Sequence, residues 1–100
     1  MTLKGFHVRP TGEGDKVTVL ADADEVRVIT TIQRGVVDDV SPSKLATAKE
    51  REDFIKRNLE SVSRVIGTKF HAGQFKPGGH GGNERFIELE TADLQGLDLN

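Results

Sequence analysis

The chain has 100 residues, a formal net charge of −2, no cysteine, and 30% charged against 35% apolar residues. This length fits one domain spanning residues 1–100, and the lack of cysteine excludes disulfides, thiolate metal sites and a cysteine nucleophile. The net charge gives no reason to expect a nucleic-acid partner.

Three short runs in the first third alternate apolar and polar side chains, as half-buried strands do. They are LKGFHVR at 3–9, KVTVLA at 16–21 and VRVITTIQ at 26–33, and polar turns separate them. Short β-branched runs joined by tight turns predict an antiparallel meander. The side chains expected to share the inward faces of the second and third runs are Val17, Val19 and Ala21, and Val26, Val28, Thr30 and Ile32.

The middle of the chain carries two start signals for helices. Ser41 as N-cap and Pro42 at the first helical position predict a short helix near 43–47. A T-x-x-E capping box at 47–50 predicts a long helix from 48 to about 66. The apolar face of this long helix consists of Ile55, Leu59, Val62 and Ile66, with Phe54 and Val65 beside it.

Gly67 is either the C-terminal stop of the long helix or an interior glycine. After it, RFIELET at 85–91 resumes strand alternation, with Ile87 and Leu89 expected inward. The periodicity changes from two to 3.6 and back, which is typical of an α+β protein. We expect an antiparallel sheet of three to four strands, packed on one long helix with a short helix before it.

The stretch FKPGGHGGNERF at 75–86 is rich in glycine, but it lies between a helix and a strand. Glycine cradles for phosphate have the opposite order, strand then helix, so we interpret the stretch as a connection. The alternative is a small-ligand or metal-binding loop within 71–85. Its candidate residues are His71, Gly78, Gly79, His80, Gly81 and Gly82. Since the spacings of the histidines match no metal motif, we predict no metal site.

Basic residues are concentrated in one segment, 56–85. Two acidic residues, Glu60 and Glu84, accompany them, so the segment carries +4 and the rest of the chain −6. The basic residues are Lys56, Arg57, Arg64, Lys69, Lys76 and Arg85. On a continuous helix, the first three can share an exposed face. The segment is therefore a candidate partner-binding surface.

Three of the five phenylalanines, Phe70, Phe75 and Phe86, are interleaved with these basic residues. Rings beside basic side chains can form a stacking platform for single-stranded nucleic acid. The chain has no Trp or Tyr, however, and needs its rings for the core. The sequence favours the core interpretation.

The sequence contains no cofactor fingerprint and no nucleophile motif, so we predict a protein that is not an enzyme and has no cofactor. The paired carboxylates Asp22/Asp24 and Asp38/Asp39 are expected in turns, where they hydrogen-bond the local backbone. The first residues, MTLKGFHVRP, lack the apolar run of a signal peptide, and no stretch has the length of a membrane span. We therefore expect a cytoplasmic location and no membrane partner.

The order of SPSKLA, EDFIKRNLESVSRVI and RFIELETADL resembles a family of short bacterial proteins catalogued only as a domain of unknown function. The resemblance covers about residues 17–94, and the sequence departs from it at the long glycine loop and at Leu59. The corresponding positions are Phe54, Arg57, Glu60, Ile87, Leu89, Thr91, Asp93 and Leu94. It implies an α+β fold, and some family members are labelled regulator-like.

These observations predict a small binding or regulatory module that uses the basic segment 56–85. A protein partner, a homodimer and an anionic macromolecule are all open alternatives. Among anionic macromolecules, nucleic acid is disfavoured by the net charge of −2.

Overall fold

The computed structural model describes residues 2–10 and 15–100, whose Cα atoms have a radius of gyration of 13.0 Å. The strands are β1 (Lys4–Arg9), β2 (Lys16–Ala23), β3 (Val26–Gln33), β4 (Lys76–Gly78) and β5 (Glu84–Leu89). The helices are α1 (Arg34–Val40), α2 (Ala48–Arg57), α3 (Leu59–His71), the 3-10 turn η1 (His80–Gly82) and α4 (Thr91–Leu94). The chain therefore has the predicted α+β composition.

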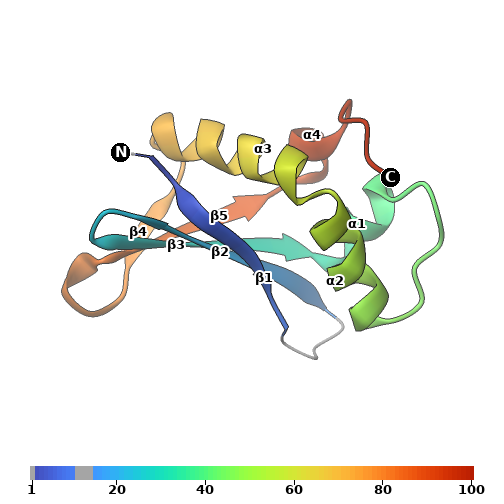
Figure 1. Ribbon diagram of the computed structural model, residues 1–100, viewed down its shortest axis with the longest axis horizontal. Helices are drawn as coiled ribbons and strands as arrows, with labels where there is room; N and C mark the ends of the chain where they lie inside the picture. The colour runs from blue at the N-terminus through green and yellow to red at the C-terminus, as the bar shows by residue number, and fades with distance from the viewer. Residues whose placement is uncertain (1, 11–14) are drawn as a thin grey trace.

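The five strands form one mixed sheet in the order β1-β2-β3-β5-β4 (Figure 1). The antiparallel meander of β1, β2 and β3 is confirmed. The expectation of a purely antiparallel sheet of three to four strands is wrong, because β5 pairs with β3 in parallel. Parallel neighbours require a crossover connection, and the helices between β3 and β4 supply it.

The strand that sequence analysis missed is β4, which has only three residues and contains Pro77. It pairs antiparallel with the first half of β5 at the edge of the sheet. Proline has no backbone N–H to donate, so it is tolerated at such an edge. The glycine-rich stretch therefore connects two strands of a hairpin.

One face of the sheet is buried against the helices, which gather along one side of the strands in Figure 1. The inward side chains predicted for β2, β3 and β5 are buried, except Val26, which is half-buried. The helices complete the core with Val37, Phe54, Ile55, Val62, Ile66, Phe70 and Leu94. Burial of these apolar groups is the main term that stabilises the fold.

The short helix lies at a different place from the predicted one. It is α1, directly after β3, and residues 43–47 form no helix. Ser41 Oγ donates to the carbonyl of Ser43 at 2.6 Å and accepts from its backbone N–H at 3.2 Å. A serine that bonds its local backbone in this way stabilises a turn in competition with a helix, so the expected N-cap is a turn.

The predicted long helix is divided at Asn58 into α2 and α3. Asn58 is buried, with φ −109° and ψ 19°, and its Nδ2 donates to the carbonyl of Phe54 at 2.8 Å. Its Oδ1 accepts from the backbone N–H of Asn100 at 2.9 Å. The side-chain amide of Asn58 therefore bonds both a carbonyl of α2 and the backbone N–H of Asn100, 42 residues away.

The two ends of the divided helix agree in part with expectation. Thr47 is the N-cap of α2, and its Oγ1 accepts from the backbone N–H of Glu50 at 3.1 Å. At the other end α3 continues to His71, so Gly67 is an interior glycine. Of the helices formed by residues 2–10 and 15–100, none combines the length and apolarity needed to cross a membrane.

Candidate functional site

The sheet face that points away from the core is the candidate site, and we call it the open face. Strand alternation and register assign it the side chains opposite those of the core. They are Lys4, His7, Arg9, Lys16, Thr18, Leu20, Asp22, Arg27, Ile29, Thr31, Gln33, Lys76, Glu84, Phe86 and Glu88. All of them are exposed or half-exposed except Thr18.

A single row of side chains crosses the open face through all five strands. The register pairs His7 with Leu20, Leu20 with Ile29, Ile29 with Phe86, and Phe86 with Lys76. The row is thus apolar in its middle and basic or titratable at its ends. Phe86, at 40% exposure, is the only large apolar side chain classed as exposed in the described part of the chain.

The ring of Phe86 covers Gly78 on the neighbouring strand. A Cβ atom added at Gly78 would lie 3.0 Å from Cδ2 of Phe86 and still closer to Cε2, which no real side chain permits. Glycine at this position therefore makes room for the ring. A ring that packs over a glycine on the adjacent strand is held in position on the sheet surface.

Beside this ring is a hollow of about 530 Å³. The open face contributes Lys16, Gln33 and Phe86 to its lining, and the loop before β4 contributes Gln74 and Phe75. Its volume is within the range of small-ligand pockets. Aromatic, amide and basic side chains thus line one depression.

The open face has the opposite charge from the molecule as a whole. It carries five basic and three acidic side chains, a formal charge of +2, in a chain whose total is −2. The remainder of the chain therefore carries −4. One ion pair lies on this face, between Arg27 Nε and Asp22 Oδ1 at 3.8 Å, with both side chains more than half exposed.

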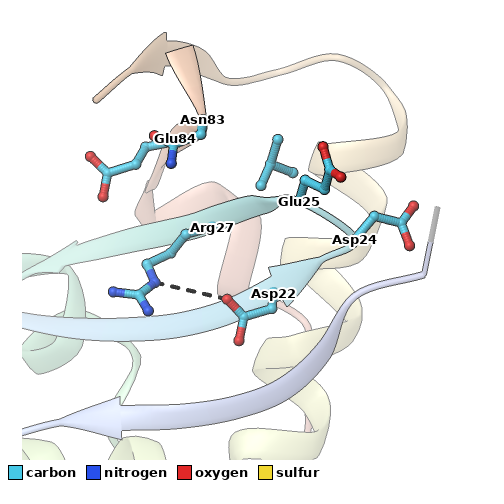
Figure 2. Close-up of a pocket in the computed structure, with 7 residues that line it drawn as sticks. Asp22, Asp24, Glu25, Arg27, Asn83 and Glu84 are labelled. Carbon is cyan, nitrogen blue, oxygen red and sulfur yellow. Dashed lines mark ion pairs between the residues drawn. The ribbon is translucent and has the colours of Figure 1, made fainter. Parts of the chain in front are cut away.

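A second hollow, of about 360 Å³, lies by the turn between β2 and β3 and has an acidic lining. Figure 2 shows Arg27 directed toward Asp22, while the carboxylates of Asp24 and Glu84 extend away from each other. Within residues 2–10 and 15–100, no three His, Asp or Glu side chains are grouped closely enough to hold a metal ion. The hollow has no arrangement that suits a cation.

The predicted basic segment is spread over several elements. Lys56 and Arg57 belong to α2 and Arg64 to α3, so the division at Asn58 removes the continuous helix on which their shared face depended. Lys76 belongs to β4, and α2 and β4 lie toward opposite ends of the molecule in Figure 1. The structure therefore does not bring the six side chains together as one patch.

Several of these basic groups have intramolecular partners. Arg64 Nη2 pairs with Glu60 Oε1 at 2.7 Å, and Lys69 Nζ pairs with Asp93 Oδ2 at 3.1 Å. The Lys69 pair is the more buried, with about a fifth of each side chain exposed.

Both remaining arginines of the segment also have neighbours. Arg57 donates to the carbonyl of Asn100 at 3.4 Å, and its guanidinium lies 5.8 Å from the centroid of a phenylalanine ring in its own helix. Arg85 donates to the carbonyl of Glu84 at 2.9 Å and lies 5.6 Å from the ring centroid of Phe75. Lys76 is the member of the segment that belongs to the open face.

The three interleaved rings have different environments. Phe70 is buried, as the core interpretation predicts, and Phe75 is half-buried and stacks on Phe70 with centroids 5.4 Å apart. Phe86 is exposed on the sheet surface. The core interpretation is thus wrong for Phe86.

The glycine and histidine loop has the geometry of a connection. Gly79, Gly81 and Gly82 have φ angles of 78°, 70° and 70°, a region that favours glycine. His71 is at the end of α3 in a T-shaped ring contact with Phe70, and His80 is in η1. These positions support the interpretation as a connection.

The paired carboxylates lie only partly in turns. Asp24 is in the turn between β2 and β3 with φ 53°, and Asp22 is near the end of β2. The prediction of a turn is wrong for Asp38 and Asp39, which belong to α1. Asp38 Oδ1 accepts from Arg51 Nε at 2.9 Å, so its role is in packing α1 against α2.

Leu20 and Ile29 are apolar open-face residues that sequence reasoning did not single out. Both are apolar residues at strand positions where alternation predicts a polar, outward side chain, and this mismatch is the signal that the sequence contains. An apolar residue on the outward side of one strand is unremarkable alone. Two such residues paired across neighbouring strands, next to an exposed ring, form a continuous apolar surface.

Comparison with known proteins identifies no relative of this chain. No family model matches it, and no curated protein or solved structure does so either. The resemblance to the bacterial family of unknown function therefore stays a prediction. Function has to be argued from the geometry of the open face.

Proposed function

We propose that this protein is a cytoplasmic binding or regulatory module, not an enzyme, and that it engages an anionic macromolecule on the open face of its sheet. The observation that carries the proposal is the charge of this face, +2 against −4 for the rest of the chain. A positive surface on an acidic protein directs an anionic partner to one side of the molecule. Of the predicted basic segment, the proposal retains Lys76.

The same charge argues against a homodimer through this face. A two-fold dimer places the same surface of two copies together, and here that brings two positive faces into contact. Like charges placed against each other disfavour association. An anionic partner meets no such repulsion.

The test is a titration of isotope-labelled protein with a sulfated hexasaccharide, followed by backbone amide shifts in low-salt buffer. We expect shifts at Lys16, Ile29, Lys76 and Phe86, and weaker binding as salt is added, because counterions screen these contacts. The double variant Lys16→Glu/Lys76→Glu should abolish these shifts.

A matched control has the same change of charge away from the open face. Lys44→Glu/Lys49→Glu alters two exposed lysines outside both the open face and the basic segment 56–85 and should leave the titration unchanged. Equal loss in both variants would show that total charge, and not this face, governs binding. Shifts centred on Lys56, Arg57 and Arg64 would favour the helical part of the basic segment instead.

A further inference from the structure

We infer that the anionic macromolecule is single-stranded nucleic acid, with an unpaired base stacked on Phe86 in the hollow beside it. This inference rests on the proposed function and assigns it a partner class. It starts from the ring itself, which is 40% exposed and packed over Gly78. A ring already held in place loses little conformational freedom when a base stacks on it.

Basic side chains are placed where the phosphates of a stacked strand would pass. Lys16 on β2 and Lys76 on β4 both line the hollow that contains Phe86. Three strand spacings separate β2 from β4 in the sheet order, about 14 Å, and the register places Lys16 four positions along the strands from the row of Phe86 and Lys76, about 13 Å in the perpendicular direction. Lys76, directly beside Phe86, and the more distant Lys16 can therefore contact different phosphates of one strand whose base lies over Phe86.

Polar side chains in the same hollow match the edges of bases. Gln33 and Gln74 each offer an amide donor and acceptor, and Thr31 offers a hydroxyl. Glu88 also lines the hollow and repels phosphate, but a carboxylate accepts hydrogen bonds from the amino group of a base. Thr31 and Glu88 thus lie in the row between the Phe86–Lys76 pair and the Lys16–Gln33 pair.

This distribution favours a single strand over the other anionic polymers. An acidic peptide has carboxylates to pair with lysines but no flat π-system for the ring of Phe86. Duplex nucleic acid has its bases stacked internally, so their faces cannot reach a ring on a sheet surface. Only an unpaired strand uses the ring, the amides and the lysines together.

The experiment measures fluorescence anisotropy with four labelled probes: a mixed-sequence RNA 12-mer, the corresponding DNA 12-mer, the 12-base-pair duplex and a twelve-residue polyglutamate peptide. We expect both single strands to bind more tightly than the duplex or the peptide. Phe86→Leu should weaken single-strand binding by about 5- to 150-fold, the equivalent of ~1–3 kcal/mol for one stacked base.

A second variant tests the stacking directly. The chain has no tryptophan or tyrosine, so Phe86→Trp introduces a single indole whose emission reports on this position alone. We expect this variant to retain the affinity of the original protein, and its fluorescence to be quenched by either single strand. Quenching needs contact with the base, which a merely structural role for Phe86 does not provide.

The outcomes separate this inference from the proposed function. Equal binding of polyglutamate and the oligonucleotides, with no effect of Phe86→Leu, would overturn the inference and leave the charged face as a binding site. Equal binding of the duplex, without indole quenching, would overturn it in the same way. If none of the four probes nor the sulfated hexasaccharide binds, both proposals are wrong.

Discussion

Arg51 Nε donates to Asp38 Oδ1 across 2.9 Å, and the two side chains differ in burial, since 5% of Arg51 but 37% of Asp38 is exposed. Arg51 Nη2 also donates to the carbonyl of Leu45 at 3.2 Å. A buried guanidinium is thus neutralised by a carboxylate that solvent can reach. The pair joins α1 to α2 through the turn between them.

Removing the carboxylate of Asp38 should destabilise the fold more than removing the buried guanidinium of Arg51. We expect Asp38→Ala to lower the free energy of unfolding by about 2–3 kcal/mol, because it leaves Arg51 charged and unpaired. Arg51→Met should have a smaller effect, since it removes the buried charge and retains much of the side-chain volume. Urea denaturation of both variants checks the order, and a larger loss in Arg51→Met would contradict it.

Thr30 offers a stabilising substitution. Its side chain faces the core with 1% of the residue exposed, and its Oγ1 has no hydrogen-bond partner among residues 2–10 and 15–100. Thr30→Val replaces the hydroxyl by a methyl group of similar shape, so we expect the free energy of unfolding to rise by about 1 kcal/mol. Thermal and urea melts measure the change. Thr31→Val, at a half-exposed neighbour, is the control and should change stability by less.

Two alanine substitutions can distinguish a central from a peripheral residue on the apolar face of the helices. Ile55 is fully buried, and Ile55→Ala should cost about 2–5 kcal/mol. Leu59 is only partly buried against the core, so Leu59→Ala should cost less than Ile55→Ala. Equal losses in urea denaturation would mean that Leu59 is as central as its spacing in the sequence suggests.

Two glycines of the β4–β5 hairpin should respond differently to alanine. At Gly81 a Cβ meets nothing within 4 Å, but φ is 70°, so Gly81→Ala should cost about 1 kcal/mol through the backbone alone. At Gly78 the new methyl would displace the ring of Phe86. We therefore expect Gly78→Ala to shift the ring proton resonances of Phe86 and Gly81→Ala to leave them nearly unchanged.

Alternation of side chains was sufficient to predict most of the sheet. In β2, β3 and β5 the inward residues form an unbroken period of two, and each run is long enough to show it. β4 has three residues with a proline among them, too few to show any period. Its pairing depends on the register with β5, which local sequence does not contain.

The division of the long helix shows why periodicity alone overestimates continuity. The apolar stripe through Ile55, Val62 and Ile66 is continuous, and all three residues are buried. The break arises at Asn58, whose side chain bonds both the preceding turn and the distant Asn100. That second contact is 42 residues away, so no local pattern predicts it.

Of the candidate site, sequence analysis provided the ring and one lysine. The sequence pattern places Phe86 beside basic residues that include Lys76, although it favours burial of the ring. Lys16, Leu20 and Ile29 belong to strands far away in the sequence, and the order of strands in the sheet brings them to the same face. The order of strands in the sheet depends on tertiary packing, so the local sequence does not predict which side chains share the open face.

The parallel pairing of β3 with β5 also constrains how the chain acquires its structure. One edge of β3 pairs with β2, which a two-residue turn joins to it. The other edge pairs with β5, where Ile87, the partner of Thr30, lies 57 positions later in the chain. Closing so long a loop is slow compared with forming a hairpin. We therefore expect the hairpin of β2 and β3 to form before β5 pairs with it, and the free edge of β3 is then of the kind that recruits foreign strands. We expect the pairing of Glu84–Leu89 with β3 to be a late step of folding, which closes this edge against misassociation.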